Sequence, residues 1–336
     1  MEEIIDRMQE CTLCPRKCKV NRESGQSGIC GQTADIKVAR ADLHMWEEPC
    51  ISGNQGSGAV FFSGCSLHCV FCQNHNIAAG NAGQIISVER LAQIFLELQE
   101  KGANNINLVT ATQFVPQIIK ALDIAKEQGL KLPIVYNTSA YEEVETLRML
   151  DGYVDVYLPD LKYVDSGLSH KYSHAADYFE KASAAIAEMV RQTGEMEFIA
   201  EKRYQTDEVE FAAEHVLQKF GIEEYQRRSE AGESLIMTRG VIVRHLLLPG
   251  CTTDSKRVIK YLLETYGERI FISIMNQYTP LPHVSAYPEL NRKVTPKEYE
   301  AVLDYAIENG IENGFLQEGE AASESFIPEF DGEGVF

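Results

Sequence analysis

The chain has 336 residues, and its 31 Lys and Arg residues against 50 Asp and Glu residues give a formal net charge of −19. This acidic balance argues against a nucleic-acid-binding protein, because affinity for a phosphate backbone depends on clustered positive charge. Hydrophobic residues make up 44% of the chain, which is the composition of a globular protein with a full core. No stretch reaches the roughly 20 apolar residues that span a bilayer, and the acidic start MEEIIDRMQE is unlike a secretory signal. We therefore expect a cytoplasmic protein without membrane contact.

The distribution of cysteines points to metal or redox chemistry. The chain has 9 cysteines, an odd number, and most lie in its first quarter. They are Cys11, Cys14, Cys18, Cys30, Cys50, Cys65, Cys69, Cys72 and Cys251. In a cytoplasmic protein such a set is more typical of metal ligands than of disulfides. Residues 1–57, which are punctuated by Gly and Pro, are therefore predicted to form a small cysteine-rich lobe organised by metal.

From residue 58 onward, short apolar runs alternate with amphipathic stretches, which predicts β/α units around a parallel sheet. Six strands are predicted, at Ala59–Ser63, Ile106–Thr110, Pro133–Asn137, Val154–Pro159, Val241–Leu248 and Ile270–Met275. Six helices are predicted, at Val88–Gln99, Val115–Gln128, Glu142–Leu150, Ala176–Gln192, Ser255–Tyr266 and Pro296–Asn309. The predicted fold is an α/β, open partial (β/α)6 barrel of the TIM type over residues 58–317.

Two segments depart from this alternation. Residues 195–236 are highly charged and are predicted to be a helical insertion. Because the insertion lies in a connection from a helix to a strand, we expect it at the amino-terminal face of the barrel, away from the face where such folds do chemistry. Residues 318–336 are acidic and rich in Gly and Ser, and they are predicted to form a loose C-terminal extension.

The most specific motif is a C-x3-C-x2-C loop directly after the first predicted strand, formed by Cys65, Cys69 and Cys72. Three thiolates on one loop can hold three irons of a [4Fe–4S] cluster and leave the fourth iron without a protein ligand. Zinc is the alternative, but a structural zinc site closes with four ligands, and His68 or His75 would have to supply the fourth. Spacing alone favours iron–sulfur without excluding zinc.

This loop resembles the C-x3-C-x-aromatic-C motif of the radical S-adenosylmethionine superfamily, with Phe71 at the aromatic position. The resemblance implies that S-adenosylmethionine chelates the open iron. It also implies that one electron from the cluster cleaves S-adenosylmethionine to a 5′-deoxyadenosyl radical, which then takes a hydrogen atom from a substrate. The cluster is expected to be sensitive to oxygen. The electron donor implied is a protein of the flavodoxin or ferredoxin type.

Polar residues at the other strand ends can be placed by the same resemblance. Asp160 and Lys162 resemble the Asp-x-Lys element of the activases of glycyl radical enzymes, which implies that Lys162 approaches the carboxylate of S-adenosylmethionine and that Asp160 helps to hold a monovalent cation. Arg244 is implied to reach the cofactor, although a structural carboxylate partner is its alternative. Asn137 is implied to lie beside the cofactor, or else to form a turn.

At the end of the second predicted strand, the superfamily commonly has Gly-Gly-Glu, whereas this chain has Val109-Thr110-Ala111-Thr112-Gln113. The contact with the amino group of S-adenosylmethionine is therefore expected near Thr110 and Thr112. His44 and Trp46 could line the cavity or could pack the lobe onto the barrel.

Cys11, Cys14, Cys18 and Cys30 form a C-x2-C-x3-C-x11-C pattern. Their ligand count suits tetrahedral zinc and a second iron–sulfur cluster equally, and free thiols are the remaining alternative. Cys50 and Cys251 are expected to be buried or loop thiols, although Cys251 could face the cavity. The chain lacks the eight-cysteine inserted domain that many activases carry after the radical motif.

Almost the whole chain resembles an activase-like branch that carries the label of pyruvate formate-lyase activating enzyme. The leading hypothesis is a monomeric enzyme that installs a glycyl radical on a partner enzyme. One alternative is a radical enzyme that modifies a small molecule or peptide. The other is an electron-transfer or zinc-structured binding protein without radical chemistry.

Overall fold

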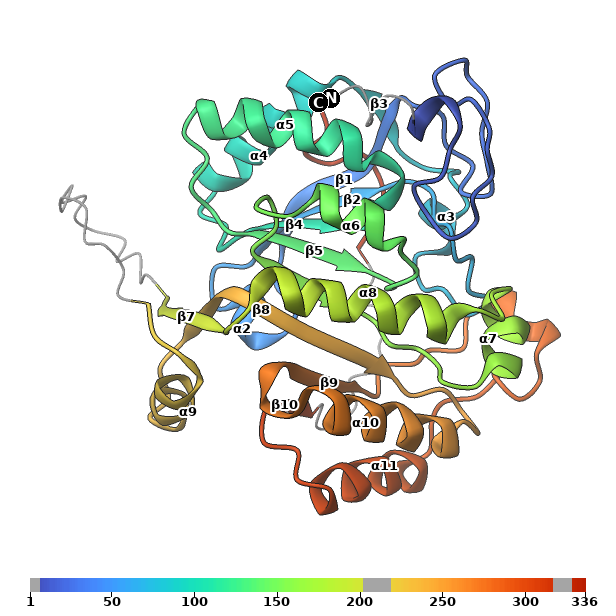
Figure 1. Cartoon of the computed structure of the whole chain (residues 1–336), viewed down its shortest axis with the longest axis vertical. Coiled ribbons are helices and arrows are strands. Elements are labelled where there is room, and N and C mark those ends of the chain that lie inside the picture. The colour runs from blue at the N-terminus through green and yellow to red at the C-terminus, as the bar shows by residue number, and fades with distance from the viewer. Residues whose placement is uncertain (1–6, 202–218, 317–327) are drawn as a thin grey trace.

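The computed structural model describes residues 7–201, 219–316 and 328–336. Its centre is a sheet with the strand order β10-β9-β8-β6-β5-β4-β2-β1-β3 (Figure 1). The parallel strands are β2 (Ser57–Phe62), β4 (Ile106–Val109), β5 (Ile134–Thr138), β6 (Val156–Pro159), β8 (Leu235–Leu246), β9 (Phe271–Met275) and β10 (Gly314–Leu316). The order begins at β10 and ends at β3, so the sheet is not closed, and the predicted open partial barrel is confirmed.

All six predicted strands are present, and β10 adds a further parallel strand. The prediction missed β1 (Ile36–His44), which pairs antiparallel with β2, and β3 (Gln84–Ile86), which pairs antiparallel with β1. The sequence analysis assigned the residues of β1 to the cysteine-rich lobe of residues 1–57. Its sequence IKVARADLH has buried residues such as Val38, Ala39 and Ala41, as expected of a strand that belongs to the sheet.

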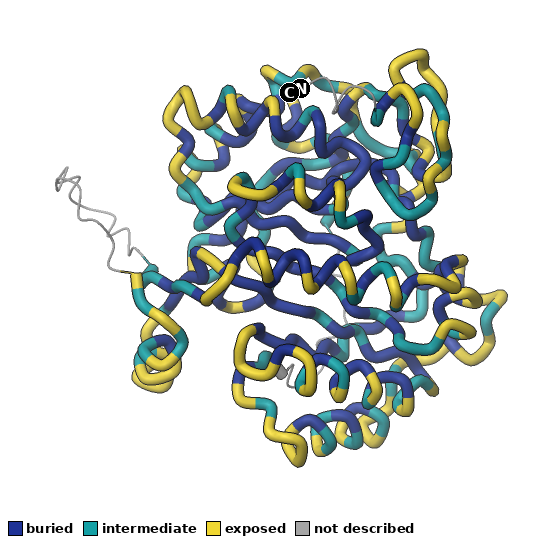
Figure 2. The backbone as a smooth tube through the Cα atoms, in the orientation of Figure 1, coloured by how far each residue is buried: buried dark blue, intermediate teal, exposed yellow. Residues whose placement is uncertain are grey.

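Helices cover the outer face of this sheet. They are α4 (Val88–Glu100), α5 (Val115–Glu127), α6 (Val144–Met149), α7 (Ser166–Ser173), α8 (Tyr178–Thr193), α10 (Thr252–Tyr266) and α11 (Pro296–Glu308). Figure 2 shows their buried stripes turned toward the sheet and their exposed stripes turned outward. In α11 the predicted N-cap Thr295 forms a capping box with Glu298. None of the helices in the described ranges has the length and apolarity of a membrane span.

The insertion begins as a strand rather than as a helix. β7 (Glu197–Ala200) pairs antiparallel with the first half of β8, and α9 (Ile222–Glu230) returns the chain to β8. β7 and α9 therefore lie at the amino-terminal edge of the parallel strands, as expected, and far from the strand tips in Figure 1. Residues 202–218 lie outside the described ranges.

The prediction of a loose C-terminal extension is wrong for residues 328–336. The amide of Ala41 donates to the carbonyl of Glu333 at 2.9 Å, and the amide of Gly332 donates to the carbonyl of Ala39 at 3.0 Å. The physical reason is the short β3, which pairs only with Ile36–Val38 of β1. The next backbone groups of β1 would otherwise lack partners, and the chain end supplies them. Residues 318–327 of the predicted extension lie outside the described ranges.

Candidate functional site

A cavity of about 250 Å³ lies at the carboxyl ends of the parallel strands. This is the end of a parallel α/β sheet where ligands usually bind. Its walls come from the loop after β2, from the tips of β4, β5, β6, β8 and β9, and from the segment after β1. The predicted site residues that line it are Cys65, Cys69, Phe71, Cys72, Thr110, Asn137, Asp160, Lys162 and Arg244.

The loop after β2 brings the three thiols to one wall of the cavity. Gly64 opens the loop at φ +86°, a conformation that favours glycine, and a Cβ there would also stand 2.5 Å from the carbonyl oxygen of Cys30. Cys65, Cys69 and Cys72 are half-buried free thiols. The Ser173 hydroxyl donates to the Cys69 sulfur at 3.1 Å. One face of each thiol is therefore packed while the loop stays open to the cavity.

Burial controls the protonation of Cys69 and Cys72. It raises the pKa of Cys69 to about 11, although the charge of Lys162 opposes the shift. Burial also raises the pKa of Cys72 to about 12, and the nearby thiols raise it further. Without metal the two thiols are neutral at pH 7, so a metal that binds thiolates must displace their protons.

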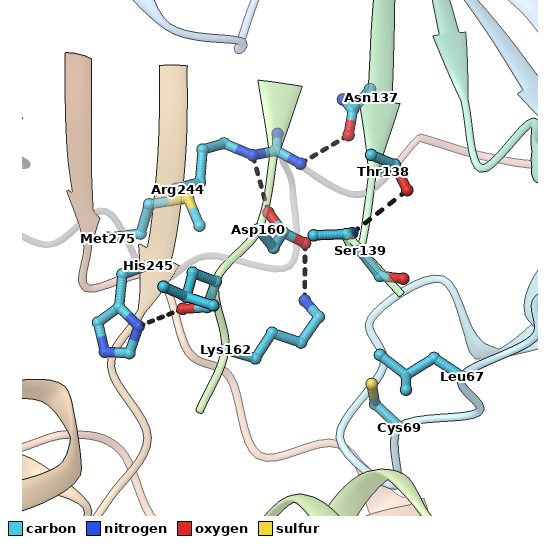
Figure 3. A network of polar contacts seen from close by, with 12 residues as sticks. Leu67, Cys69, Asn137, Thr138, Ser139, Asp160, Lys162, Arg244, His245 and Met275 are labelled. Atoms are coloured by element: carbon cyan, nitrogen blue, oxygen red, sulfur yellow. Dashed lines mark hydrogen bonds and ion pairs between the residues drawn. The ribbon is translucent and has the colours of Figure 1, made fainter. Parts of the chain in front are cut away.

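Asp160, Lys162 and Arg244 form one ion-pair network across the cavity (Figure 3). Arg244 Nε donates to Asp160 Oδ1 at 2.9 Å, and Lys162 Nζ donates to Asp160 Oδ2 at 2.7 Å. Arg244 Nη2 donates to Asn137 Oδ1 at 2.6 Å. Burial alone would raise the pKa of Asp160, but the two cations outweigh burial and lower it. Asp160 is therefore ionised, and both of its oxygens already have cationic partners, so nothing here supports the expected monovalent cation.

Glu47 is a cavity-lining residue that the sequence analysis missed, and the buried Glu48 follows it in the chain. Glu47 Oε2 pairs with Arg244 Nη1 at 3.2 Å, and Glu47 Oε1 accepts from Asn137 Nδ2 at 3.1 Å. Arg244 thus has the structural carboxylate partners that we considered as its alternative. Glu48 Oε2 is buried and has no hydrogen-bond partner. Burial raises the pKa of both glutamates, while Arg244 opposes the shift. The cavity lining therefore contains two carboxylates, Glu47 and Asp160.

The two threonines after β4, Thr110 and Thr112, have different positions relative to the cavity. Thr110 has a left-handed φ of +59° and lines the cavity. The chain then turns into a short 3-10 helix, Thr112–Phe114, which carries Thr112 away from the cavity. Thr112 instead donates to the buried Glu142 at 2.6 Å. We had placed Glu142 at the start of a helix and assigned it no role.

The remaining candidates are also placed by the structure. Phe71 is buried near Tyr163 and Tyr278, with ring centroids 6.4 Å from each. His44 and Trp46 line the cavity, as one of the two alternatives proposed. Cys50 is buried, and Cys251 is half-buried before α10 and outside the cavity lining.

The zinc alternative receives no support. In residues 7–201, 219–316 and 328–336, no three His, Cys, Asp or Glu side chains are arranged to hold one metal ion. His68 Nε2 lies 2.7 Å from the carbonyl of Ile29, and the His75 ring packs against His283 at 4.3 Å. Neither imidazole is grouped with the three thiols as a ligand of one ion in the described part of the chain.

Comparisons with known proteins agree with the fold. Residues 59–195 match the family model described as Radical SAM superfamily. This part of the chain is therefore similar to that superfamily. The chain is 24% identical to the "Uncharacterized protein MJ0674" of Methanocaldococcus jannaschii, over 89% of this chain and 74% of that protein.

Two solved structures are similar at lower levels. SuiB of Streptococcus suis bound to S-adenosylmethionine is 13% identical, with a TM-score of 0.45 over 76% of this chain and 48% of SuiB. This chain thus spans about half of the length of SuiB. A domain of the pyruvate-formate lyase-activating enzyme of Bacteroides vulgatus is 12% identical, with a TM-score of 0.35 over 61% of this chain and 91% of that domain.

The superfamily implies a [4Fe–4S] cluster and S-adenosylmethionine. The residues present fit both groups. For the cluster, the donor set is three thiols on one loop, which is the set that leaves one iron open. For S-adenosylmethionine, Lys162 and Arg244 bring two cations to the same cavity, where its carboxylate would need them.

Proposed function

We propose that the chain binds a [4Fe–4S] cluster at Cys65, Cys69 and Cys72, cleaves S-adenosylmethionine reductively, and starts a reaction by hydrogen-atom abstraction. One observation carries this proposal: the three thiols line the same cavity as Lys162 and Arg244. When bound, the cluster and S-adenosylmethionine supply a 5′-deoxyadenosyl radical. The difficult chemistry belongs to these groups, and the protein orients them and excludes water.

The chain's own residues have separable tasks in this proposal. Lys162 is held charged, because Asp160 raises its pKa against the effect of burial. Lys162 and Arg244 attract the carboxylate of the ligand, while Asp160 and Glu47 hold the two cations in place. Phe71 lies on the triad loop among buried aromatic rings and keeps water from that side of the cavity.

The test is anaerobic reconstitution with iron and sulfide, reduction, addition of S-adenosylmethionine, and chromatographic measurement of 5′-deoxyadenosine. We expect the nucleoside from the wild type and none from Cys69→Ala. Cys251→Ala is the matched control, because this half-buried cysteine lies outside the cavity lining. Equal nucleoside formation by Cys69→Ala and the wild type would refute the proposal. Exposure of the reconstituted protein to air should abolish the activity.

We infer that the substrate is a glycyl loop of a partner enzyme and that a flavodoxin- or ferredoxin-type protein supplies the electron. The support is the Asp160-x-Lys162 element, Arg244, and a sheet with two ends, which leaves a side through which a loop can enter. A candidate partner encoded nearby should acquire a glycyl doublet in its electron paramagnetic resonance spectrum. No doublet with any such partner would leave a radical enzyme for a small molecule or peptide as the better hypothesis.

A non-radical electron-transfer protein is the remaining candidate. It predicts a closed cluster whose spectrum does not respond to S-adenosylmethionine. The position of Lys162 and Arg244 argues against it, because both cations line the same cavity as the three thiols, where a ligand of the cluster would lie.

A further inference from the structure

Thiols of the N-terminal lobe gather beside the triad loop. Cys11, Cys14 and Cys30 line one small cavity, and Ser66 of the triad loop lines it too. All of the lobe's cysteines are free. The fully buried Arg22 fixes this arrangement by donating to the carbonyl of Gln113 at 2.6 Å, which ties the lobe to the loop after β4.

Backbone amides point at the lobe sulfurs. The backbone N–H of Arg16 donates to the Cys14 sulfur, and that of Gln32 donates to the Cys30 sulfur. Each donor lies two positions after its cysteine. The N–H of Ile29 reaches the Cys18 sulfur at 3.3 Å. In the triad loop, the N–H of Leu67 donates to the Cys65 sulfur and the N–H of Asn74 donates to the Cys72 sulfur, again two positions after each cysteine. Such donors stabilise thiolates and set the potential of iron–sulfur clusters, whereas a thiol packed as a small hydrophobic group needs none.

The arrangement of the lobe thiols bears on the choice between the two metal alternatives. A zinc ion draws every sulfur to about 2.3 Å from a single centre. A four-iron cluster binds each thiolate at a different iron, so its ligands stand further apart. In the described ranges of the chain, neither the lobe cysteines nor the triad cysteines are arranged around a single ion. In the described ranges the lobe thus shares with the triad both the amide donors and the lack of a grouping around one ion.

We propose that Cys11, Cys14, Cys18 and Cys30 bind a second [4Fe–4S] cluster, which relays electrons to the cluster at the triad. With four thiolates this cluster has no open iron, so it transfers electrons and does not bind S-adenosylmethionine. A flavodoxin- or ferredoxin-type donor gives it one electron, and the same electron passes on to the triad cluster. The lobe cluster returns to its oxidised state and the triad cluster is reduced by one electron. The relay role rests on the proposed function, whereas the metal site does not.

The contacts between the two loops support the relay. The carbonyl of Ile29, next to Cys30, accepts from the ring of His68, next to Cys69, at 2.7 Å. One hydrogen bond therefore connects the backbone beside a lobe ligand with the residue beside a triad ligand. Arg16 adds a clamp, because its guanidinium donates to the carbonyls of Ser66, Ser173 and His174 at 2.8, 3.1 and 2.6 Å.

The metal site is tested by counting iron and zinc in anaerobically reconstituted protein. The wild type should hold about 8 irons per chain, and a variant with all three triad cysteines changed to Ala should hold about 4. The triad variant keeps the lobe intact, so misfolding of a lobe variant cannot decide the result. Cys251→Ala should match the wild type. A triad variant that holds no iron, or that holds one zinc, would overturn the proposal, and so would a wild type with about 4 irons that still forms 5′-deoxyadenosine.

The relay is tested with Cys14→Ala/Cys30→Ala, by following the electron paramagnetic resonance signal of the reduced triad cluster. We expect this variant to keep the triad signal, which should still appear with dithionite and still change when S-adenosylmethionine is added. Its rate of appearance with a flavodoxin donor should fall at least about tenfold, which corresponds to about 1.4 kcal/mol in the barrier. An unchanged rate would overturn the relay. If the double variant loses the triad signal, the same rate is measured in Arg16→Ala with both clusters bound. An unchanged rate in Arg16→Ala would also overturn the relay.

Discussion

Replacing Glu142 by Gln should change how the stability of the protein depends on pH. Glu142 follows β5 and is 1% exposed. Its Oε1 accepts from Thr112 and Thr138 at 2.6 and 2.5 Å, and its Oε2 has no partner. Burial raises the pKa of Glu142 to about 7 from the ordinary 4.5, and the hydroxyl donors reduce the shift. Gln keeps the size of the side chain and removes its ionisation.

The direction in which stability changes with pH follows from the higher pKa of Glu142 in the folded state. Between pH 4.5 and about 7 the folded protein holds a proton on Glu142 that the unfolded chain has released. The contribution to stability is therefore complete below pH 4.5 and is lost as the pH rises through about 7. The shift corresponds to about 3 kcal/mol, and most of it falls between about pH 5 and about pH 8. Over that interval the wild type should lose about 2 kcal/mol more than Glu142→Gln.

The assay is equilibrium unfolding in urea at several pH values. Because other groups titrate equally in both proteins, the difference between the wild type and Glu142→Gln isolates this carboxyl. Glu145→Gln, on the exposed side of α6, is the control and should follow the wild type. If the free energies of unfolding of the wild type and Glu142→Gln change in parallel with pH, Glu142 is not protonated at neutral pH and the reasoning fails.

Three further substitutions test the network, the lobe and the chain end. Arg244→Ala removes a charge from the cavity and should weaken binding of S-adenosylmethionine by about tenfold or more in equilibrium dialysis of the reconstituted protein; unchanged affinity would exclude a contact with the ligand. Arg16→Ala removes the guanidinium that donates to four backbone carbonyls and should lower the free energy of unfolding by about 1 to 3 kcal/mol. Gly334→Ala places a Cβ 1.8 Å from the carbonyl of Ala41, so hydrogen exchange at the Ala41 amide should accelerate. Gly332→Ala, whose Cβ meets no atom closer than 3.9 Å, should have a smaller effect.

The parallel strands and the residues at their tips were predictable because both depend on local sequence. A buried apolar run fixes a strand, and its carboxyl end fixes the direction in which the next polar residue points. Asn137, Asp160 and Arg244 come from three different strands, yet their side chains meet because the carboxyl ends of parallel strands share one edge.

The parts that were not predictable depend on contacts between distant segments. Glu47 meets Arg244 across 197 positions of sequence, and no local pattern marks such a pair. Thr112 follows Thr110 by two positions, but the left-handed φ of Thr110 turns the chain and directs Thr112 away from the cavity. The docking of the chain end on β1 depends on how short β3 is, which only the pairing register reveals.

The site is assembled from three parts of the chain, and the superfamily match covers one of them. Arg244 follows the matched residues, and Glu47 precedes them. Gln113, within the match, donates to the carbonyls of Ser63 and Gly64 at 2.9 and 3.1 Å and so holds the start of the triad loop. Arg22 of the lobe in turn holds the Gln113 carbonyl. The matched segment thus supplies the ligands proposed for the cluster, while the segments before and after it determine the charge of the cavity and the position of the loop that carries those ligands.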